Sequence, residues 1–179
     1  MLDFTDFSAL VFYFTIYAFL GWLLENITSL VTTGNFFKVN FWLGPFKPMY
    51  GIAPVLLLSF LNANSSWITM IVLCLLIPTT VEYISGFLLE KMSKRKWWDY
   101  SQKPLNIHGY ICPFYSICWL ILSWISLHLI QPVLNLFYTH IQSIWSLVSP
   151  FIFIYFIVET TFASKRHYHK RTSFSEQTT

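Results

Sequence analysis

Residues 91–109 read KMSKRKWWDYSQKPLNIHG, and they form the longest polar interval between the apolar segments of this 179-residue chain. Five of the eleven Lys and Arg residues lie in this stretch, together with a pair of tryptophans. The sequence on either side is apolar over about 20 residues, the length that a helix needs to cross a bilayer. The stretch therefore predicts a polar loop that connects membrane-spanning helices.

The composition agrees with this prediction. The chain is 55% hydrophobic and only 11% charged, whereas soluble domains carry roughly 25% charged residues. Too few charges are present to cover a water-exposed surface, so we predict an all-α, polytopic membrane protein whose surroundings are the lipid bilayer. We interpret the net charge of +3 as a topology signal and predict no nucleic-acid partner.

Five apolar segments predict five transmembrane helices, over about residues 8–31, 45–61, 67–90, 110–130 and 144–163. Residues 1–164 would then form one transmembrane domain, followed by a polar cytoplasmic tail over residues 165–179 without fixed structure. The second segment is short. Gly44, Pro45 and Pro48 predict that it starts with a bent or re-entrant stretch.

The positions of the basic residues predict the orientation. All of them fall after the first segment, after the third segment or in the tail: Lys38, Lys47, Lys91, Lys94, Arg95, Lys96, Lys103, Lys165, Arg166, Lys170 and Arg171. Because basic loops stay in the cytoplasm, we predict an N-terminus outside and a C-terminus inside the cell. One span more or fewer would destroy this pattern.

A short internal repeat has an offset of 65 residues. Gly-Trp-Leu-Leu-Glu at 21–25 matches Gly-Phe-Leu-Leu-Glu at 86–90, and Gly44, Pro48 and Tyr50 have counterparts at the same offset. A repeat of this kind predicts two helical hairpins of the same sense, one from segments one and two and one from segments three and four. The fifth segment would then lie outside the repeat, as a helix added to the two hairpins.

Carboxylates inside the apolar segments are the main candidate site residues. Glu25, Glu82 and Glu159 lie about 5–12 Å inside the predicted cytoplasmic boundary, and Glu90 lies near the end of the third segment. A charge in the bilayer costs about 2.5–3.5 kcal/mol at the centre, so these groups should face the bundle interior. They either bind a substrate, proton or ion, or they anchor packing through Lys47, tyrosines or backbone amides.

We predict that Glu25, Glu82 and Glu159 line one polar cavity open to the cytoplasm. Further candidate residues of this site are Glu90, Lys47, Tyr50, Asp99, Asn106 and His108. Asp99 and His108 also allow a metal site or an acid–base pair, although a lone loop histidine is more often a hydrogen-bonding residue. The chain shows no nucleotide-binding or catalytic motif, so we predict no catalytic residue, metal or cofactor.

Several motifs resemble those of one bacterial family. They are Gly-Trp-x-x-Glu at 21–25, Gly-Pro-x-x-Pro-x-Tyr-Gly at 44–51, Glu-Tyr-x-x-Gly-x-x-x-Glu at 82–90, Trp-Trp-Asp-Tyr-Ser at 97–101 and Asn-Ile-x-Gly at 106–109. Together, over about residues 12–130, they resemble the small membrane proteins of the putative ABC-transporter type IV (permease) family. The resemblance implies a multi-pass protein of the bacterial cell membrane and a separate ATPase subunit as partner. It implies no catalytic residues.

Three function hypotheses follow. The first is a permease-like transport component of unknown substrate, in which a homodimer would supply ten helices. The second is an intramembrane enzyme that acts on a lipid or lipid-linked substrate at the cytoplasmic face. The third is a structural or regulatory membrane protein. The repeat, the carboxylates and the family resemblance favour the first.

Overall fold

The structure is a computed structural model that describes residues 6–62 and 64–176, with side chains as far as residue 167. Its elements are α1 (Phe7–Thr33), α2 (Pro48–Phe60), α3 (Trp67–Ser93), α4 (Pro113–Ile125), the π-helical η1 (Ser126–Ile130) and α5 (Gln131–Glu176). These described residues contain no strand, apart from one isolated bridge between Ile107 and Ile111. The predicted all-α class is confirmed.

The helices begin where the sequence supplies suitable ends. Asp6 accepts a hydrogen bond from the Ala9 amide at 3.1 Å and caps α1. Pro48 and Pro113 occupy the first turns of α2 and α4, where a missing amide hydrogen removes no helical bond. Helix α2 begins three residues after residue 45, the predicted start of the second segment, whose first residues were expected to be bent.

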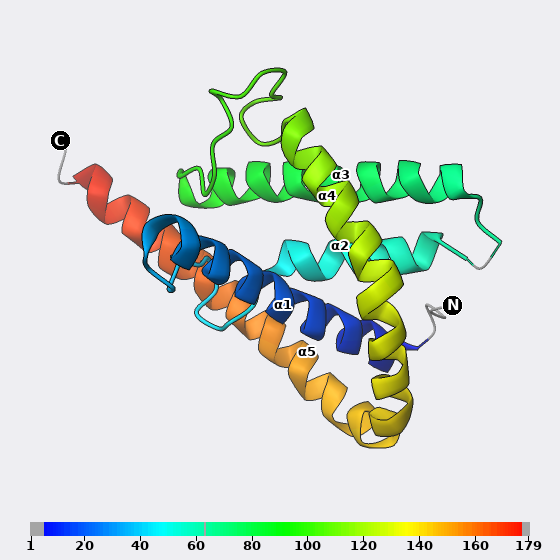
Figure 1. Cartoon of the computed structure of the whole chain (residues 1–179). Helices are drawn as coiled ribbons and strands as arrows, with labels where there is room; N and C mark the ends of the chain where they lie inside the picture. The colour runs from blue at the N-terminus through cyan, green and yellow to red at the C-terminus, as the bar shows by residue number, and fades with distance from the viewer. Residues whose placement is uncertain (1–5, 63, 177–179) are drawn as a thin grey trace.

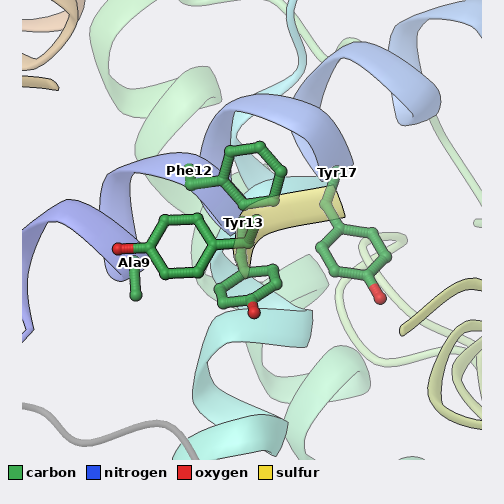
Figure 2. Packing of buried hydrophobic residues seen from close by; sticks show 5 residues of the cluster. Ala9, Phe12, Tyr13 and Tyr17 are labelled. Atoms are coloured by element: carbon green, nitrogen blue, oxygen red, sulfur yellow. The ribbon is translucent and has the colours of Figure 1, made fainter. Parts of the chain in front are cut away.

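The helices pack in the spatial order α5, α1, α2, α3 and α4, with a further contact between α3 and α5 (Figure 1). One core cluster joins α1 to α5, and Figure 2 shows its five buried residues. Phe12 and Tyr13 of α1 pack against Tyr138 of α5 with ring centroids 5.1 and 5.8 Å apart. Aromatic side chains thus fill the space between these two helices.

Glycines allow α1 and α2 to approach closely. A Cβ atom on Gly21 would lie 2.1 Å from the Tyr50 ring, and one on Gly51 would lie 2.7 Å from the Phe14 carbonyl oxygen. Small residues at helix contacts have this effect in membrane proteins generally. The close contact places Tyr50, a candidate site residue, directly against α1.

The chain is helical where a loop was predicted between residues 130 and 144, and the predicted tail is helical as far as Glu176. Two polar side chains of this region bond to tyrosines of α1 instead of marking a loop. Tyr17 donates to Gln131 at 2.8 Å, and Tyr13 donates to Asn135 at 2.7 Å. These bonds satisfy polar groups inside the bundle, which removes the reason to expect an exposed loop.

Two features that bend helices lie at residues 126–132, between α4 and the part of α5 that bonds to α1 through Gln131, Asn135 and Tyr138. Figure 1 shows the chain continuing from there to a corner in the colour of residues near 140, from which the rest of α5 returns beside α1. The Gln131 amide bonds to the Ser126 carbonyl, a π-helical pattern, and Pro132 has no amide hydrogen for the carbonyl of His128. Both features are recognised causes of helix bending.

Three helical stretches of the described chain are long and apolar enough to cross a membrane: Phe7–Thr33, Trp67–Ser93 and Pro113–His167. The last has 55 residues, or about 80 Å if straight, against a hydrocarbon core of about 30 Å. Helix α2 has only 13 residues, about 20 Å, which is too short to cross alone. Five spans therefore remain a prediction.

The segments that carry the basic residues meet at one end of the molecule. Phe41 of loop 34–47 lies 5.8 Å from Trp97 of loop 94–112 and 4.9 Å from His167 of α5, between ring centroids. We call this end, formed by loops 34–47 and 94–112 and residues 159–167, the basic end. Segments that are far apart in the sequence and carry basic residues therefore lie side by side in the fold.

Candidate functional site

Two lysines hold Glu25 near the basic end of α1. Glu25 Oε2 accepts hydrogen bonds from Lys47 Nζ at 2.5 Å and from Lys38 Nζ at 2.9 Å. The Lys47 side chain is 14% exposed, whereas that of Lys38 is 47% exposed. Because water weakens ion pairs, Lys47 is the stronger partner.

The backbone of loop 34–47 brings these lysines back to α1. Gly34 ends α1 in the left-handed conformation, with φ of 74°, which glycine adopts readily. The Lys38 amide then donates to the fully buried Asn26 side chain at 2.8 Å, and the Lys47 amide donates to the Ala18 carbonyl at 2.9 Å. Asn26 was not predicted as a site residue, although a polar residue beside Glu25 was a usable signal.

Glu82 of α3 is 2% exposed. Its Oε1 atom accepts a hydrogen bond from the Tyr100 hydroxyl at 3.1 Å, and the Tyr100 ring stacks on Tyr115 with centroids 4.2 Å apart. Its Oε2 atom is buried and has no hydrogen-bond partner in the described part of the chain. Such a group is costly in a protein interior, so an unmatched carboxylate oxygen calls for an explanation.

A cavity of about 1600 Å³ opens between the helices, and both carboxylates line it. Lys47 and Tyr50 also lie on its wall. Tyr50 packs against Trp119 of α4 at 4.9 Å between centroids. Of the nine candidate residues, the structure thus brings four to this cavity: Glu25, Lys47, Tyr50 and Glu82.

Glu159 does not line this cavity, although its depth suggested that it would. It accepts hydrogen bonds from the backbone amides of Leu43 and Gly44, the second at 3.2 Å. Arg166 donates to the Phe41 carbonyl at 2.6 Å nearby. Glu159 therefore attaches loop 34–47 to α5, which is the packing role that the sequence had left open.

Glu90 also lies away from the cavity wall. It is on α3, two helical turns after Glu82, and its Oε2 atom is likewise buried without a hydrogen-bond partner among the described residues. The two glutamates thus share a helix and a buried oxygen but differ in their access to the cavity. Glu90 is a matched control for Glu82.

Asp99 and Asn106 shape loop 94–112 and do not line the cavity. Asp99 accepts hydrogen bonds from the Ser101 hydroxyl and from the Ser101 amide, the latter at 3.0 Å. These bonds, with Lys96 nearby, lower the pKa of the Asp99 carboxyl from its ordinary value. Asn106 donates to the Lys103 carbonyl at 2.9 Å and accepts from the Gly109 amide at 3.0 Å.

His108 lies outside the cavity as well, with its Nδ1 atom 3.1 Å from the Tyr83 hydroxyl. It is exposed and has φ of 55°. No group of three or more His, Cys, Asp or Glu side chains in the described part of the chain is arranged to hold a metal ion. The geometry thus places His108 in a hydrogen bond with a tyrosine.

Sequence reasoning missed most aromatic residues of the cavity wall, and Tyr100 and Trp119 are the two that contact predicted site residues described above. Tyr100 belongs to the Trp-Trp-Asp-Tyr-Ser motif at 97–101, which was a usable signal. Trp119 lies in an apolar segment that contains aromatic residues throughout, so the sequence does not distinguish it. Only the packing of α4 against Tyr50 shows its position.

Comparisons with curated proteins and with solved structures give no match. A comparison with protein families gives one match, over residues 12–164. It confirms the resemblance carried by the motifs of residues 21–109 and extends it through most of α5. The helices long enough to cross a membrane and this match together show a multi-pass membrane protein, and the chain belongs to the family described as "Putative ABC-transporter type IV".

Proposed function

We propose that this protein is the membrane-embedded component of a transport system and that the cavity is its ligand site. The observation that carries the proposal is the placement of Glu25, Lys47 and Glu82 on the wall of one cavity of about 1600 Å³. Ionisable residues inside membrane segments are costly and commonly mark a substrate or ion path. The membership in an ABC-transporter-type family supports the same function.

The proposed topology has five passes, with the N-terminus outside and the C-terminus in the cytoplasm. Two observations support it: the basic segments gather at one end, and Pro113–His167 is too long for one straight pass. In this proposal the second pass combines α2 with part of loop 34–47. The repeat, with Pro48 and Pro113 opening corresponding helices, supports two hairpins of the same sense.

The proposed partner is a separate ATPase subunit that binds the basic end, because this chain carries no nucleotide-binding motif. A homodimer would supply ten passes around two cavities. The enzyme hypothesis has less support. Asp99 and His108, the candidate acid–base pair, and Asn106, which also supported this hypothesis, do not line the cavity.

The test is to isolate the full chain from native bacterial membranes and to identify co-purifying subunits by mass spectrometry. We expect a subunit with a nucleotide-binding motif, and we expect the isolated complex to hydrolyse ATP. The cavity is tested in the same complex with Ser85→Trp, which places a large side chain on the cavity wall. Ile84→Trp is the control, because Ile84 is 49% exposed and lies off that wall.

We expect Ser85→Trp to change the ATP hydrolysis rate at least about threefold and Ile84→Trp to leave it unchanged. Ligand sites of transport components are coupled to the motor that drives them, which is the reason for this expectation. Membranes that yield the chain without any ATP-hydrolysing subunit would contradict the transport proposal. Equal rates in both variants would contradict the cavity assignment alone.

A further inference from the structure

We propose that the cavity takes an amphiphile of the membrane whose head group carries a protonated amine, and that the amine binds Glu82. The inference rests on the proposed function only in taking the cavity as a ligand site. It adds the chemical class of the ligand and the residue that selects it. An aminophospholipid has the required chemistry.

The size and the walls of the cavity fit a molecule with long apolar chains. Pockets for drug-sized ligands measure about 300–1,000 Å³, and this cavity measures about 1600 Å³. Its apolar walls come from α1, α2, α4 and α5, with Phe14, Val55, Ile121, Leu122, Phe153 and Phe156 among the lining residues. A small polar solute would leave most of this apolar surface uncovered, whereas lipid chains would cover it.

The two carboxylates of the cavity wall, Glu25 and Glu82, differ in their charged and hydrogen-bonding partners. Glu25 already has two ammonium partners, Lys38 and Lys47. Glu82 has one hydroxyl donor, from Tyr100, and forms no salt bridge among the described residues. Its second oxygen is buried and has no donor at hydrogen-bond geometry among the described residues, and the Trp119 indole, which also acts on this carboxylate, is neutral. A cationic donor is therefore missing at Glu82 and not at Glu25.

A primary ammonium supplies both the charge and the hydrogen that Glu82 Oε2 lacks. A quaternary ammonium, as in choline, has the charge but no hydrogen to donate. An anionic glycerol head group would place its negative charge near the Glu82 carboxylate. Glu82 lines the cavity but is only 2% exposed, so the proposal requires the Tyr100 side chain, which bonds to Glu82, to move aside when the head group binds.

Cys118 provides a reporter in the unmodified chain. It is exposed and lines the cavity, whereas Cys74 and Cys112 are buried. The full chain in detergent micelles is titrated with phosphatidylethanolamine, phosphatidylcholine or phosphatidylglycerol of identical acyl chains. The rate of Cys118 alkylation by a maleimide is followed by intact-mass spectrometry. A ligand in the cavity slows this reaction.

We expect phosphatidylethanolamine to protect Cys118 at concentrations about tenfold lower than the other two lipids, as one charged hydrogen bond implies. Glu82→Gln should abolish this preference, because a neutral amide attracts the ammonium much less. Glu90→Gln should retain it, because Glu90 does not line the cavity. If Glu82→Gln does not fold, the three-lipid titration of the unmodified chain still decides the proposal.

Equal protection by the three lipids, or an unchanged preference in Glu82→Gln, would overturn the amine assignment and leave the cavity as a ligand site. Absence of protection by any lipid would overturn the whole inference. So would protection that rises with protein concentration in the absence of lipid, because a second copy of the chain would then be the occupant. The transport proposal is decided separately, by the ATP-hydrolysing complex.

Discussion

At the scale of single residues, the two lysines on Glu25 differ in their surroundings and therefore in their energetic weight. Breaking a buried ion pair costs about 3–5 kcal/mol, since one charge is left uncompensated, whereas exposed pairs contribute at most about 1 kcal/mol. Lys47 is 14% exposed and Lys38 is 47% exposed. The burial of the pair, and not its distance alone, decides which lysine matters.

We expect Lys47→Met to lower the free energy of unfolding by about 3 kcal/mol and Lys38→Met to lower it by less than about 1 kcal/mol. Unfolding of the purified protein by sodium dodecyl sulfate in mixed micelles measures both values. Similar losses in the two variants would show that burial does not separate the lysines, and the assignment of Lys47 as the main partner would fail.

Gly109 is a second residue whose role depends on local geometry. Its φ is +75°, and an added Cβ atom would lie 2.5 Å from Asp99 Oδ1 and 2.6 Å from Ser101 Oγ. Gly34 has nearly the same φ, +74°, but nothing lies within 4 Å of its added Cβ. An alanine at Gly34 would therefore suffer backbone strain alone, whereas an alanine at Gly109 would suffer backbone strain and steric overlap.

We expect Gly34→Ala to cost about 1 kcal/mol, the strain of a left-handed residue alone. We expect Gly109→Ala to cost at least about 1 kcal/mol more, because overpacking adds to that strain. Limited proteolysis of loop 94–112 should accelerate in Gly109→Ala and not in Gly34→Ala. Resistance of Gly109→Ala to protease would show that the loop relaxes without penalty.

The sequence predicts which residues are candidates for the site better than it predicts which residues they contact. A charged side chain inside the bilayer is costly, which identifies Glu25, Glu82 and Glu159 as candidate site residues. The rise per residue of a helix places all three at a similar depth below the membrane boundary. Depth alone does not show which side of a helix bundle a residue faces. Glu159 accepts hydrogen bonds from the backbone amides of Leu43 and Gly44, and no sequence pattern indicates how loop 34–47 folds to present these amides.

At the scale of helices, the contact between α1 and α2 is the tightest that the glycines reveal. A Cβ atom on Gly21 would lie 2.2 Å from the Tyr50 Cβ atom, which cannot move without moving α2. Its repeat counterpart, Gly86, has more space, with Tyr110 at 3.0 Å and Trp98 at 3.1 Å. The sequence repeat predicts equal sensitivity at the two glycines, whereas the packing predicts unequal sensitivity.

We expect Gly21→Ala to lower the free energy of unfolding by at least about 2 kcal/mol, because overpacking exceeds the gain in helix propensity. Gly86→Ala should change it by less than about 1 kcal/mol, since the two effects nearly cancel there. The same unfolding assay in mixed micelles measures both variants. Equal losses would favour the symmetric repeat over the packing seen in this structure.

The segment from 131 to 143 shows why helix boundaries were harder to predict than helix existence. From the sequence alone, its Gln, Asn, Thr and His residues are typical of a polar loop between two helices. In the folded chain, Gln131, Asn135 and Tyr138 bond to residues near the start of α1. Their partners lie more than a hundred residues away, and local sequence carries no information about them.

At the scale of the whole molecule, the five-pass topology has direct experimental consequences. We replace the native cysteines and introduce single cysteines at Ser65, Ser101 and His140, which lie between α2 and α3, in loop 94–112 and near the corner between α4 and α5. A membrane-impermeant maleimide added to intact cells should label the Ser65 and His140 positions and not the Ser101 position. Lysed cells, in which all three react, are the control.

Labelling at Ser101 in intact cells would invert or refute the proposed orientation. Absence of labelling at His140, with labelling retained at Ser65, would instead reduce the number of passes. The sequence predicted this topology from charge, because eleven basic residues in three segments leave few alternatives. The sequence also predicted a polar cavity lined by Glu25, Glu82 and Glu159. It could not predict the size and the mainly apolar walls of the cavity in the structure, because these depend on how the helices pack against one another.

The continuous helical chain from Pro113 to His167 also has a mechanical consequence. Helix α4 and helix α5 both contribute residues to the cavity, among them Ile121 and Phe153. The helical chain between these two residues passes through the π-helical η1 and Pro132 before it reaches the corner near residue 140 (Figure 1). A change in the bend at Pro132 alters the separation of Ile121 and Phe153, so the width of the cavity depends on a bend that lies outside its polar part. Spin labels at Ile121 and Phe153 should report this separation, and Pro132→Ala, which restores the missing amide, should narrow its distribution.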